Sequence, residues 1–156
     1  MRIWVDADAC PRSVKEILYR AATRTGTQLI LVANQPLKVP PSPHIRAVRV
    51  AAGMDVADAH IAANVAAGDL VITGDIPLAA TILRRQAHVL DPRGTRINED
   101  NIHERLSMRN LLDELRGSGI ETGGPAPLTR ADRQTFASRL DQFLARSQVA
   151  DGGRPA

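Results

Sequence analysis

Short apolar runs alternate with amphipathic segments along the first two-thirds of the chain, and this alternation restricts the fold more than any other feature. The apolar runs have the length of buried strands, and the segments between them repeat apolar residues at helical spacing. The expected strands are Ile3 to Val5, Leu29 to Ala33, Ala47 to Val50, Leu70 to Thr73 and His88 to Leu90. The pattern predicts an α/β three-layer sandwich, in which crossover helices cover both faces of a mostly parallel five-stranded sheet.

Proline, glycine and capping residues mark where the helices begin and end. The expected helices run from Pro11 to Gly26, from Val56 to Val65, from Pro77 to Arg85 and from about Asp100 to Arg116. Residues 34–44 hold prolines 36, 40, 41 and 43, which suit neither a helix interior nor a central strand. We therefore expect a stiff, exposed loop there.

The 156 residues suffice for one domain of ordinary size. We expect a sheet domain over 1–116, a linker over 117–128, a C-terminal helix packed on the domain over 129–147 and a disordered tail over 148–156. Thr129 and Asp132 predict a capping box at the start of that helix, with Asp in place of the usual Glu.

Composition excludes several classes of protein. A single cysteine rules out a disulfide framework or a thiolate zinc site, and the apolar runs fall far short of the roughly 18 residues that cross a membrane. Asp6 and Asp8 occupy the place where a signal peptide needs an apolar core, so we expect a cytoplasmic protein. Nearly all basic residues are arginines and aromatic residues are scarce, so a nucleic acid would be held by its backbone.

Acidic residues follow the apolar strands at several junctions between a strand and a helix. Asp6 and Asp8 follow the first strand, and Asp75 follows the fourth. If the strand continues to Asp8, both of the first two side chains lie on one face, where their charges repel and require a cation or a shared proton. Asp55 and Asp58 are three residues apart and lie on one face of the second helix if it begins by Asp55.

Ligands of open α/β sheets bind at the carboxyl edge, where the strand order reverses. We expect the first and fourth strands to be neighbours, in a flavodoxin-like order of 2-1-3 type or in the order 3-2-1-4-5, so that Asp75 can meet Asp6 and Asp8. Carboxylates without soft ligands favour Mg²⁺ or Mn²⁺. Each acid at the start of a helix is equally explained as an N-cap, but Asp6 stands inside the strand end, where no cap is needed.

Other reactive residue types favour structural roles. Cys10 has no histidine near it in the sequence and fits a small buried residue, and the histidines share no metal-ligand spacing. Several arginines could line a phosphate-binding groove beside the acids or cover solvated helix faces instead. They are Arg84, Arg85, Arg93, Arg96, Arg105 and Arg109.

Several motifs together resemble the bacterial YaiI/YqxD family, and the match runs from residue 1 to about 145. They are Trp4-Val5-Asp6-Ala7-Asp8-Ala9-Cys10-Pro11, Val32-Ala33-Asn34-Gln35-Pro36, Val48-Arg49-Val50, Gly53-Met54-Asp55-Val56-Ala57-Asp58, Asp69-Leu70-Val71-Ile72-Thr73-Gly74-Asp75-Ile76-Pro77-Leu78-Ala79, Pro92-Arg93-Gly94 and Thr122-Gly123-Gly124-Pro125. The resemblance implies a PIN-like domain, related to metal-dependent ribonucleases and flap-type nucleases.

Under this resemblance, the first acid of a PIN-like site corresponds to Asp6, the acid after the fourth strand to Asp75 and the intermediate acid to Asp55 or Asp58. Asp8 is additional. PIN-like nucleases commonly carry a middle Glu and a further acid after the fourth strand, which this chain lacks. This departure argues against two resident metal ions, and it is compatible with one well-held Mg²⁺ or Mn²⁺ ion and a second that arrives with the substrate.

The implied activity is hydrolysis of RNA phosphodiesters, with Asp6 and Asp75 as catalytic residues and a metal-positioned water as nucleophile. Thr73 is expected to bond a carboxylate or a substrate phosphate, and Asn34 and Gln35 to orient water or sugar at the same edge. Arg93 would contact substrate from the proposed groove.

Two other functions are compatible with the sequence. A haloacid-dehalogenase-like phosphatase also opens with a strand followed by Asp-x-Asp, with Asp6 as nucleophile and Asp8 as acid and base, although no lysine follows Lys38. A non-catalytic RNA-binding or regulatory module would keep the PIN-like shape and use the acids as a structural or capping network. Cleavage of RNA, release of phosphate or binding without cleavage would distinguish these functions.

Overall fold

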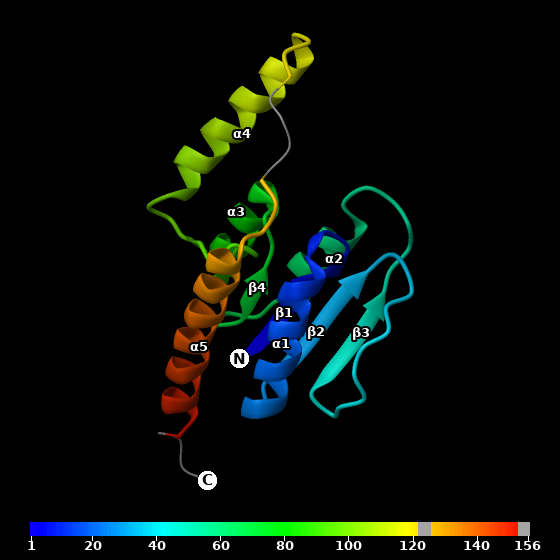
Figure 1. The fold of residues 1–156 in the computed structure, drawn as a ribbon, viewed down its shortest axis with the longest axis vertical. Coiled ribbons are helices and arrows are strands. Elements are labelled where there is room, and N and C mark those ends of the chain that lie inside the picture. The colour runs from blue at the N-terminus through cyan, green and yellow to red at the C-terminus, as the bar shows by residue number, and fades with distance from the viewer. Residues whose placement is uncertain (122–125, 153–156) are drawn as a thin grey trace.

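The computed structural model describes residues 1–121 and 126–152, and within them six strands form one sheet in the order β3-β2-β1-β4-β5-β6 (Figure 1). The strands are β1 (Arg2–Asp6), β2 (Gln28–Ala33), β3 (Ile45–Arg49), β4 (Leu70–Ile72), β5 (His88–Leu90) and β6 (Arg96–Ile97). The first five are parallel, which confirms the predicted mostly parallel sheet, and their order is 3-2-1-4-5, one of the two orders that the sequence left open. The short β6 is an addition that pairs antiparallel with β5.

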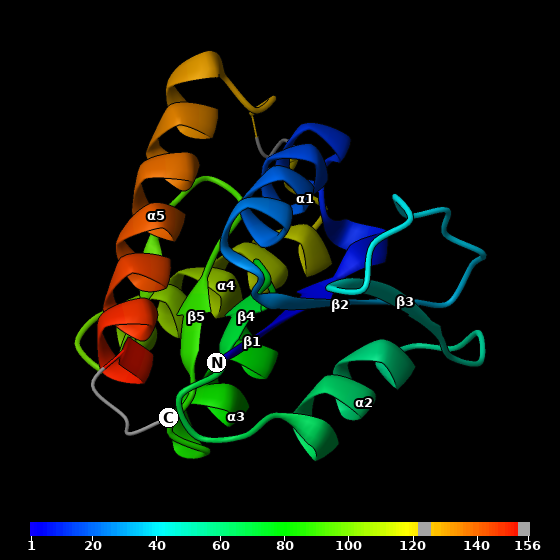
Figure 2. The ribbon, with the colours of Figure 1, turned by 90° about the horizontal axis from the view of Figure 1, so that it is seen from below.

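Helices cover both faces of this sheet, which confirms the three-layer α/β architecture (Figures 1 and 2). They are α1 (Arg12–Thr25), α2 (Val56–Asn64), α3 (Ile76–Arg84), α4 (Ile102–Gly117) and α5 (Arg130–Gly152), together with a short 3-10 helix, η1 (Ala7–Ala9). Alternate residues of β1 face opposite cores, because a strand has a period of two. Ile3 and Val5 pack with α1 and α5, whereas Trp4 packs with α2 and α3.

The ends of the helices show why the chain turns where it does. Pro11 stands at the N-cap of α1 with extended backbone, and Gly26 ends that helix with a φ of 71°. In the left-handed region a residue without Cβ is favoured, so Gly26 provides the predicted stop. Asp55 caps α2 with a φ of 64°, and Asp75 caps α3, whose first turn contains Pro77.

Helix α5 completes the core on the α1 face of the sheet, and Figure 2 shows the two helices side by side. Phe136, Leu140 and Leu144 are almost fully buried there. The predicted capping box is confirmed, because the Thr129 amide donates to Asp132 and the Asp132 amide donates to the Thr129 hydroxyl. The helix continues to Gly152, beyond the predicted end at 147.

Parts of the predicted linker and tail, residues 122–125 and 153–156, lie outside the described residues. Helix α4 extends away from the sheet (Figure 1), and its side chains Met108 and Leu111 are exposed. In the part of the chain that the structure describes, no helix is both long enough and apolar enough to cross a membrane.

Candidate functional site

Asp6 ends β1 at the carboxyl edge of the sheet, between the two halves of the strand order. Its side chain is half-buried, and loss of solvation raises its pKa above the ordinary value; the charges of Asp75 and Asp8 add to this effect. A hydrogen bond with Thr73 opposes the shift. Asp6 is therefore under the influence of two further carboxylates, those of Asp75 and Asp8.

Thr73 connects Asp6 with Asp75. Its side-chain oxygen accepts the Asp75 amide at 3.0 Å, and its hydroxyl hydrogen bond to Asp6 favours the charged carboxylate. Since Thr73 is only 2% exposed, its place in the fold favours bonding to a carboxylate over contact with a substrate phosphate. It is a positioning residue for both acids.

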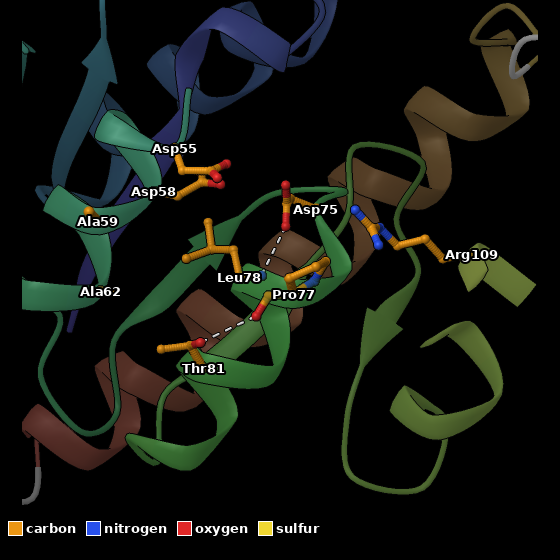
Figure 3. A pocket seen from close by; sticks show the side chains of 9 residues that line it. All are labelled: Asp55, Asp58, Ala59, Ala62, Asp75, Pro77, Leu78, Thr81 and Arg109. Carbon is orange, nitrogen blue, oxygen red and sulfur yellow. Dashed lines mark hydrogen bonds between the residues drawn. The ribbon is translucent and has the colours of Figure 1, made fainter. Parts of the chain in front are cut away.

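Asp75 reaches this edge because it is the N-cap of α3, three residues after the end of β4. One oxygen, Oδ1, accepts the Leu78 amide at 2.9 Å, which orients the carboxylate at the mouth of the pocket (Figure 3). The capping role and a ligand role are therefore compatible, because a carboxylate has several lone pairs and this hydrogen bond takes one of them.

Asp55 and Asp58 come from the start of α2 and face the same pocket as Asp75 (Figure 3). Helix α2 begins at Val56 with Asp55 as its N-cap, and the two carboxylates lie on one side of the helix as expected. Burial, the charges of Asp75, Asp6 and Asp55 and a hydrogen bond to Asp75 together raise the pKa of Asp58 to about 6. Negative charge thus accumulates here without full compensation.

The pocket between α2 and α3 has a volume of about 320 Å³. Its lining combines the three acids with apolar side chains and one cation, Arg109 of α4. Figure 3 shows Arg109 pointing toward Asp75 from the side opposite to Asp55 and Asp58. The guanidinium also lies 3.4 Å from Asp113 on its own helix, and both side chains are about half exposed. A phosphate group would find a cation on one wall and carboxylates on the other.

Within residues 1–121 and 126–152, no three His, Cys, Asp or Glu side chains are grouped so that they could hold a metal ion by themselves. The acids nevertheless fit a hydrated Mg²⁺ or Mn²⁺ ion, which typically takes one or two carboxylates and keeps several waters until a substrate phosphate binds. The donor set consists of hard oxygens, and burial together with neighbouring negative charges raises the pKa values of Asp6 and Asp58. An open site for a hydrated ion agrees with the lack of a three-ligand cage among the described residues and with the raised pKa values of the clustered acids.

Asp8 does not share a face with Asp6, because the strand ends at Asp6 and the chain turns into η1. This corrects the expectation that strand periodicity continues to Asp8. Its Oδ2 accepts a hydrogen bond from the backbone N–H of Asn34 at 2.8 Å. Asp8 in η1 is thereby joined to the residue that follows β2. Asn34 and the exposed Gln35 lie at the same sheet edge, beside Asp8 and outside the lining of the acidic pocket.

This arrangement gives the dehalogenase-like alternative little support. That chemistry needs the second acid in the pocket of the first, with a lysine nearby, whereas Asp8 is exposed and occupied by the Asn34 amide. The two lysines of the chain line another cavity.

Most of the predicted arginine groove is engaged elsewhere. Arg93 donates to Asp132 at 2.7 Å and to the Ala126 carbonyl, so it fastens the start of α5 and does not line the acidic pocket. Arg105 pairs with Asp91 and Arg96 stacks over Phe143. Of the six arginines of the groove hypothesis, Arg109 is the one that lines this pocket.

Asp91 directly follows β5 and is another acid after an apolar strand, which the sequence pattern alone did not single out. It is 8% exposed, and its Oδ1 accepts the amides of Arg93 and Thr95. These bonds and the pairing with Arg105 assign it to the turn. Cys10 is likewise structural: burial raises the pKa of its thiol to about 12, so it stays protonated, as its sequence context predicts.

Fold and site together define a doubly wound α/β protein with an acidic pocket at the carboxyl edge of its sheet. The chain belongs to the YaiI/YqxD family, since the family model described as "Uncharacterized BCR, YaiI/YqxD family" matches residues 4–146. It is 63% identical over 146 residues to a UPF0178 protein of Halorhodospira halophila, covering 94% of this chain and 97% of the relative. Over 155 residues it is 59% identical to a UPF0178 protein of Bordetella avium, covering 99% and 100%. No solved structure matches the chain significantly.

Proposed function

We propose that the chain is a PIN-like nuclease that hydrolyses RNA phosphodiesters with the help of Mg²⁺ or Mn²⁺. The observation that carries this proposal is the convergence of Asp6, Asp58 and Asp75, from three separate elements, on one edge of the sheet, where burial and then their mutual charges raise the pKa values of Asp6 and Asp58. Folding these charges together costs free energy, and a bound cation would remove that cost.

In this proposal Asp6, Asp58 and Asp75 hold the cation, with Asp55 beside them at the pocket mouth. When bound, the ion supplies Lewis acidity and a water of lowered pKa. Thr73 keeps the Asp6 carboxylate oriented, and Leu78 does the same for Asp75 through its amide. Arg109 neutralises a non-bridging phosphate oxygen from the facing wall, a task that suits its planar, permanently charged group.

Asn34, Gln35 and Asp8 form the flank of this site on the β2 side. We assign Asn34 and Gln35 to orienting the sugar or water of the substrate, with Asp8 holding the backbone of Asn34 in place. Asp8 also raises the pKa of Asp6, so it adds to the negative potential that attracts a cation.

One observation favours a second candidate, a non-catalytic RNA-binding module. Among the described residues, no three His, Cys, Asp or Glu side chains form a ready metal cage. A module of this kind would bind RNA in EDTA and never release a cut product.

The direct test is cleavage of a labelled single-stranded RNA and of a structured RNA in Mn²⁺ and in Mg²⁺. We expect Asp6→Asn and Asp75→Asn to lower the cleavage rate at least about 100-fold, a loss typical of removing one electrostatic stabiliser of a transition state. Asp141→Asn is the matched control, because Asp141 is an exposed acid of α5 that pairs with Arg24 of α1 and does not line the acidic pocket. Equal cleavage by Asp75→Asn and wild type would contradict the proposal.

A thermal scan tests the metal separately from catalysis. At about 100 times its dissociation constant, a bound ion adds roughly 2.7 kcal/mol, and we expect Mn²⁺ to raise the melting temperature accordingly. Asp6→Asn should lose this increase, while Asp141→Asn should keep it. A melting temperature of wild type that does not respond to either ion would leave the acids as caps.

A further inference from the structure

A second cavity contains both lysines of this arginine-rich chain. The sequence has two lysines, Lys15 and Lys38, and one tyrosine, Tyr19. All three line a cavity of about 730 Å³ between α1 and the proline-rich segment 37–41, roughly twice the volume of the acidic pocket. No part of the proposed catalytic machinery uses these side chains.

The cavity combines an apolar floor with a positive rim. Leu37, Val39 and Tyr19 are partly buried and pack against the core on the α1 face of the sheet. Arg12 pairs with Glu16 at 3.5 Å, which leaves the charges of Lys15 and Lys38 without a neutralising acid in the lining. The site therefore suits a ligand with a flat apolar part and an adjacent anionic group.

The cavity adjoins the acidic edge through two short links. The segment 37–41 that forms one wall begins three residues after Asn34, whose backbone amide is held by Asp8. On the other wall, Lys15 lies in the first turn of α1, the helix that follows β1 and η1 in the chain. The carboxyl ends of β1 and β2 thus separate two sites, one of them acidic and the other basic.

We propose that this cavity is a nucleotide subsite for single-stranded nucleic acid, in which Lys15 and Lys38 hold a phosphate while the base lies on Tyr19 and the loop. This inference rests on the proposed nuclease function and names its substrate class. A duplex keeps its bases stacked and paired, whereas an unpaired strand presents a base that can enter such a site. Base stacking on one tyrosine agrees with the low aromatic content, because contacts to the phosphate backbone of the nucleic acid still supply most of the affinity.

Binding measured without cleavage tests the subsite. A 5′-fluorescein single-stranded oligoribonucleotide is titrated in EDTA over a series of salt concentrations, with wild type, Lys15→Ala, Lys38→Ala and the double variant. We expect the double variant to bind about tenfold more weakly, and the slope of log K against log salt to fall by about 0.7 for each lysine that contacts a phosphate. Tyr19→Phe should bind like wild type, while Tyr19→Ala should bind more weakly at every salt concentration.

Arg46→Ala is the charge-matched control, since Arg46 is exposed near the amino end of β3, at the opposite edge of the sheet. It should change neither the affinity nor the salt slope. Unchanged binding by the double lysine variant, equal affinity for a duplex of the same sequence, or equal displacement by an acidic peptide would each overturn the subsite.

Cleavage assays keep this result distinct from the proposed function. Lysine-dependent binding by a wild type that cuts nothing in Mn²⁺ would support the subsite and reject the nuclease. Cleavage by wild type together with lysine-independent binding would reject the subsite and leave the nuclease standing.

Discussion

At the scale of single residues, the charge on Asp58 is held at a cost to stability. Its pKa of about 6 lies above the ordinary value of 3.8, because burial and the charges of Asp75, Asp6 and Asp55 disfavour the ionised form. The folded protein therefore binds more protons than the unfolded chain between these pH values. Protonated Asp58 adds to the free energy of unfolding. This stabilising contribution is fully present below about pH 4 and is lost as the pH rises through about 6.

Asp58→Asn should therefore stabilise the metal-free protein at neutral pH. The amide carries no charge and can still donate a hydrogen bond to Asp75. We expect a gain of about 1 kcal/mol at pH 7.5 in EDTA, after screening by water in the open pocket is allowed for, and no gain at pH 4. For a chain of this size that is a rise of roughly 2–4 °C in melting temperature at pH 7.5.

The control for this variant is Asp141→Asn, which removes an exposed acid paired with Arg24. It should lower or leave the melting temperature, with no gain as the pH increases. A melting temperature of Asp58→Asn at or below that of wild type at pH 7.5 would show that the acidic pocket is not strained by its own charge.

Asp69 is a different kind of acid, buried at the opposite edge of the sheet for structural reasons. It is 4% exposed and accepts hydrogen bonds from the Trp4 indole, the Arg2 amide and the Ala66 amide, in addition to its ion pair with Arg2. Asp69→Ala leaves these donors unsatisfied, so we expect a loss of about 3 kcal/mol in free energy of unfolding.

Urea denaturation followed by far-UV circular dichroism measures this loss, since the substitution itself changes the surroundings of Trp4. Asp69→Asn keeps one acceptor and should lose less. A loss below about 1 kcal/mol for Asp69→Ala would contradict the role assigned to these buried bonds.

At the scale of elements, a turn and a helix meet at Gly94. Its φ is +89°, and a Cβ there would lie 2.6 Å from the Phe136 amide nitrogen and 2.7 Å from the Thr135 carbonyl carbon. Both are backbone atoms of α5, so they cannot rotate away. Gly94→Ala should cost about 3 kcal/mol, as overpacking and an unfavourable φ add together.

Gly68 separates the two effects, because its φ is +85° and a Cβ there meets nothing within 4 Å. Gly68→Ala should cost about 1 kcal/mol, the conformational part alone. Thermal unfolding of both variants gives the comparison, and equal losses would show that α5 does not press on the turn.

The elements also show which parts of the site were predictable from local sequence. Asp6 and Asp75 follow from an apolar strand that runs into a helix, and the parallel sheet brings them together. The position of Asp8 was not predictable in this way, since the turn into η1 depends on bonding across to Asn34. Strand β6 is too short to give a periodic signal, and it exists because β5 offers a free edge.

At the scale of the whole molecule, long-range pairing decides what sequence patterns leave open. The sequence suggested that six arginines line one groove. In the structure Arg93 pairs with Asp132 and Arg105 pairs with Asp91, whereas Arg109 lines the acidic pocket. Partners 39 residues apart in the chain, as for Arg93, carry no local signal. The clustering of Lys15 and Lys38 at one cavity became visible only in the same way.

Helix α5 is the clearest case of long-range packing, because it is the last helix described and yet it completes the core around β1 and α1. Phe136, Leu140, Phe143 and Leu144 are at most 9% exposed and pack with β1 and α1. Burying four such side chains contributes roughly 6–12 kcal/mol, comparable to the roughly 5–15 kcal/mol that stabilises a whole domain.

A chain of residues 1–121 should therefore show no cooperative thermal unfolding and little dispersion in its amide proton spectrum. A chain ending at residue 147 keeps all four side chains and should melt cooperatively. Cooperative melting of the shorter chain would instead make the sheet domain independent of α5.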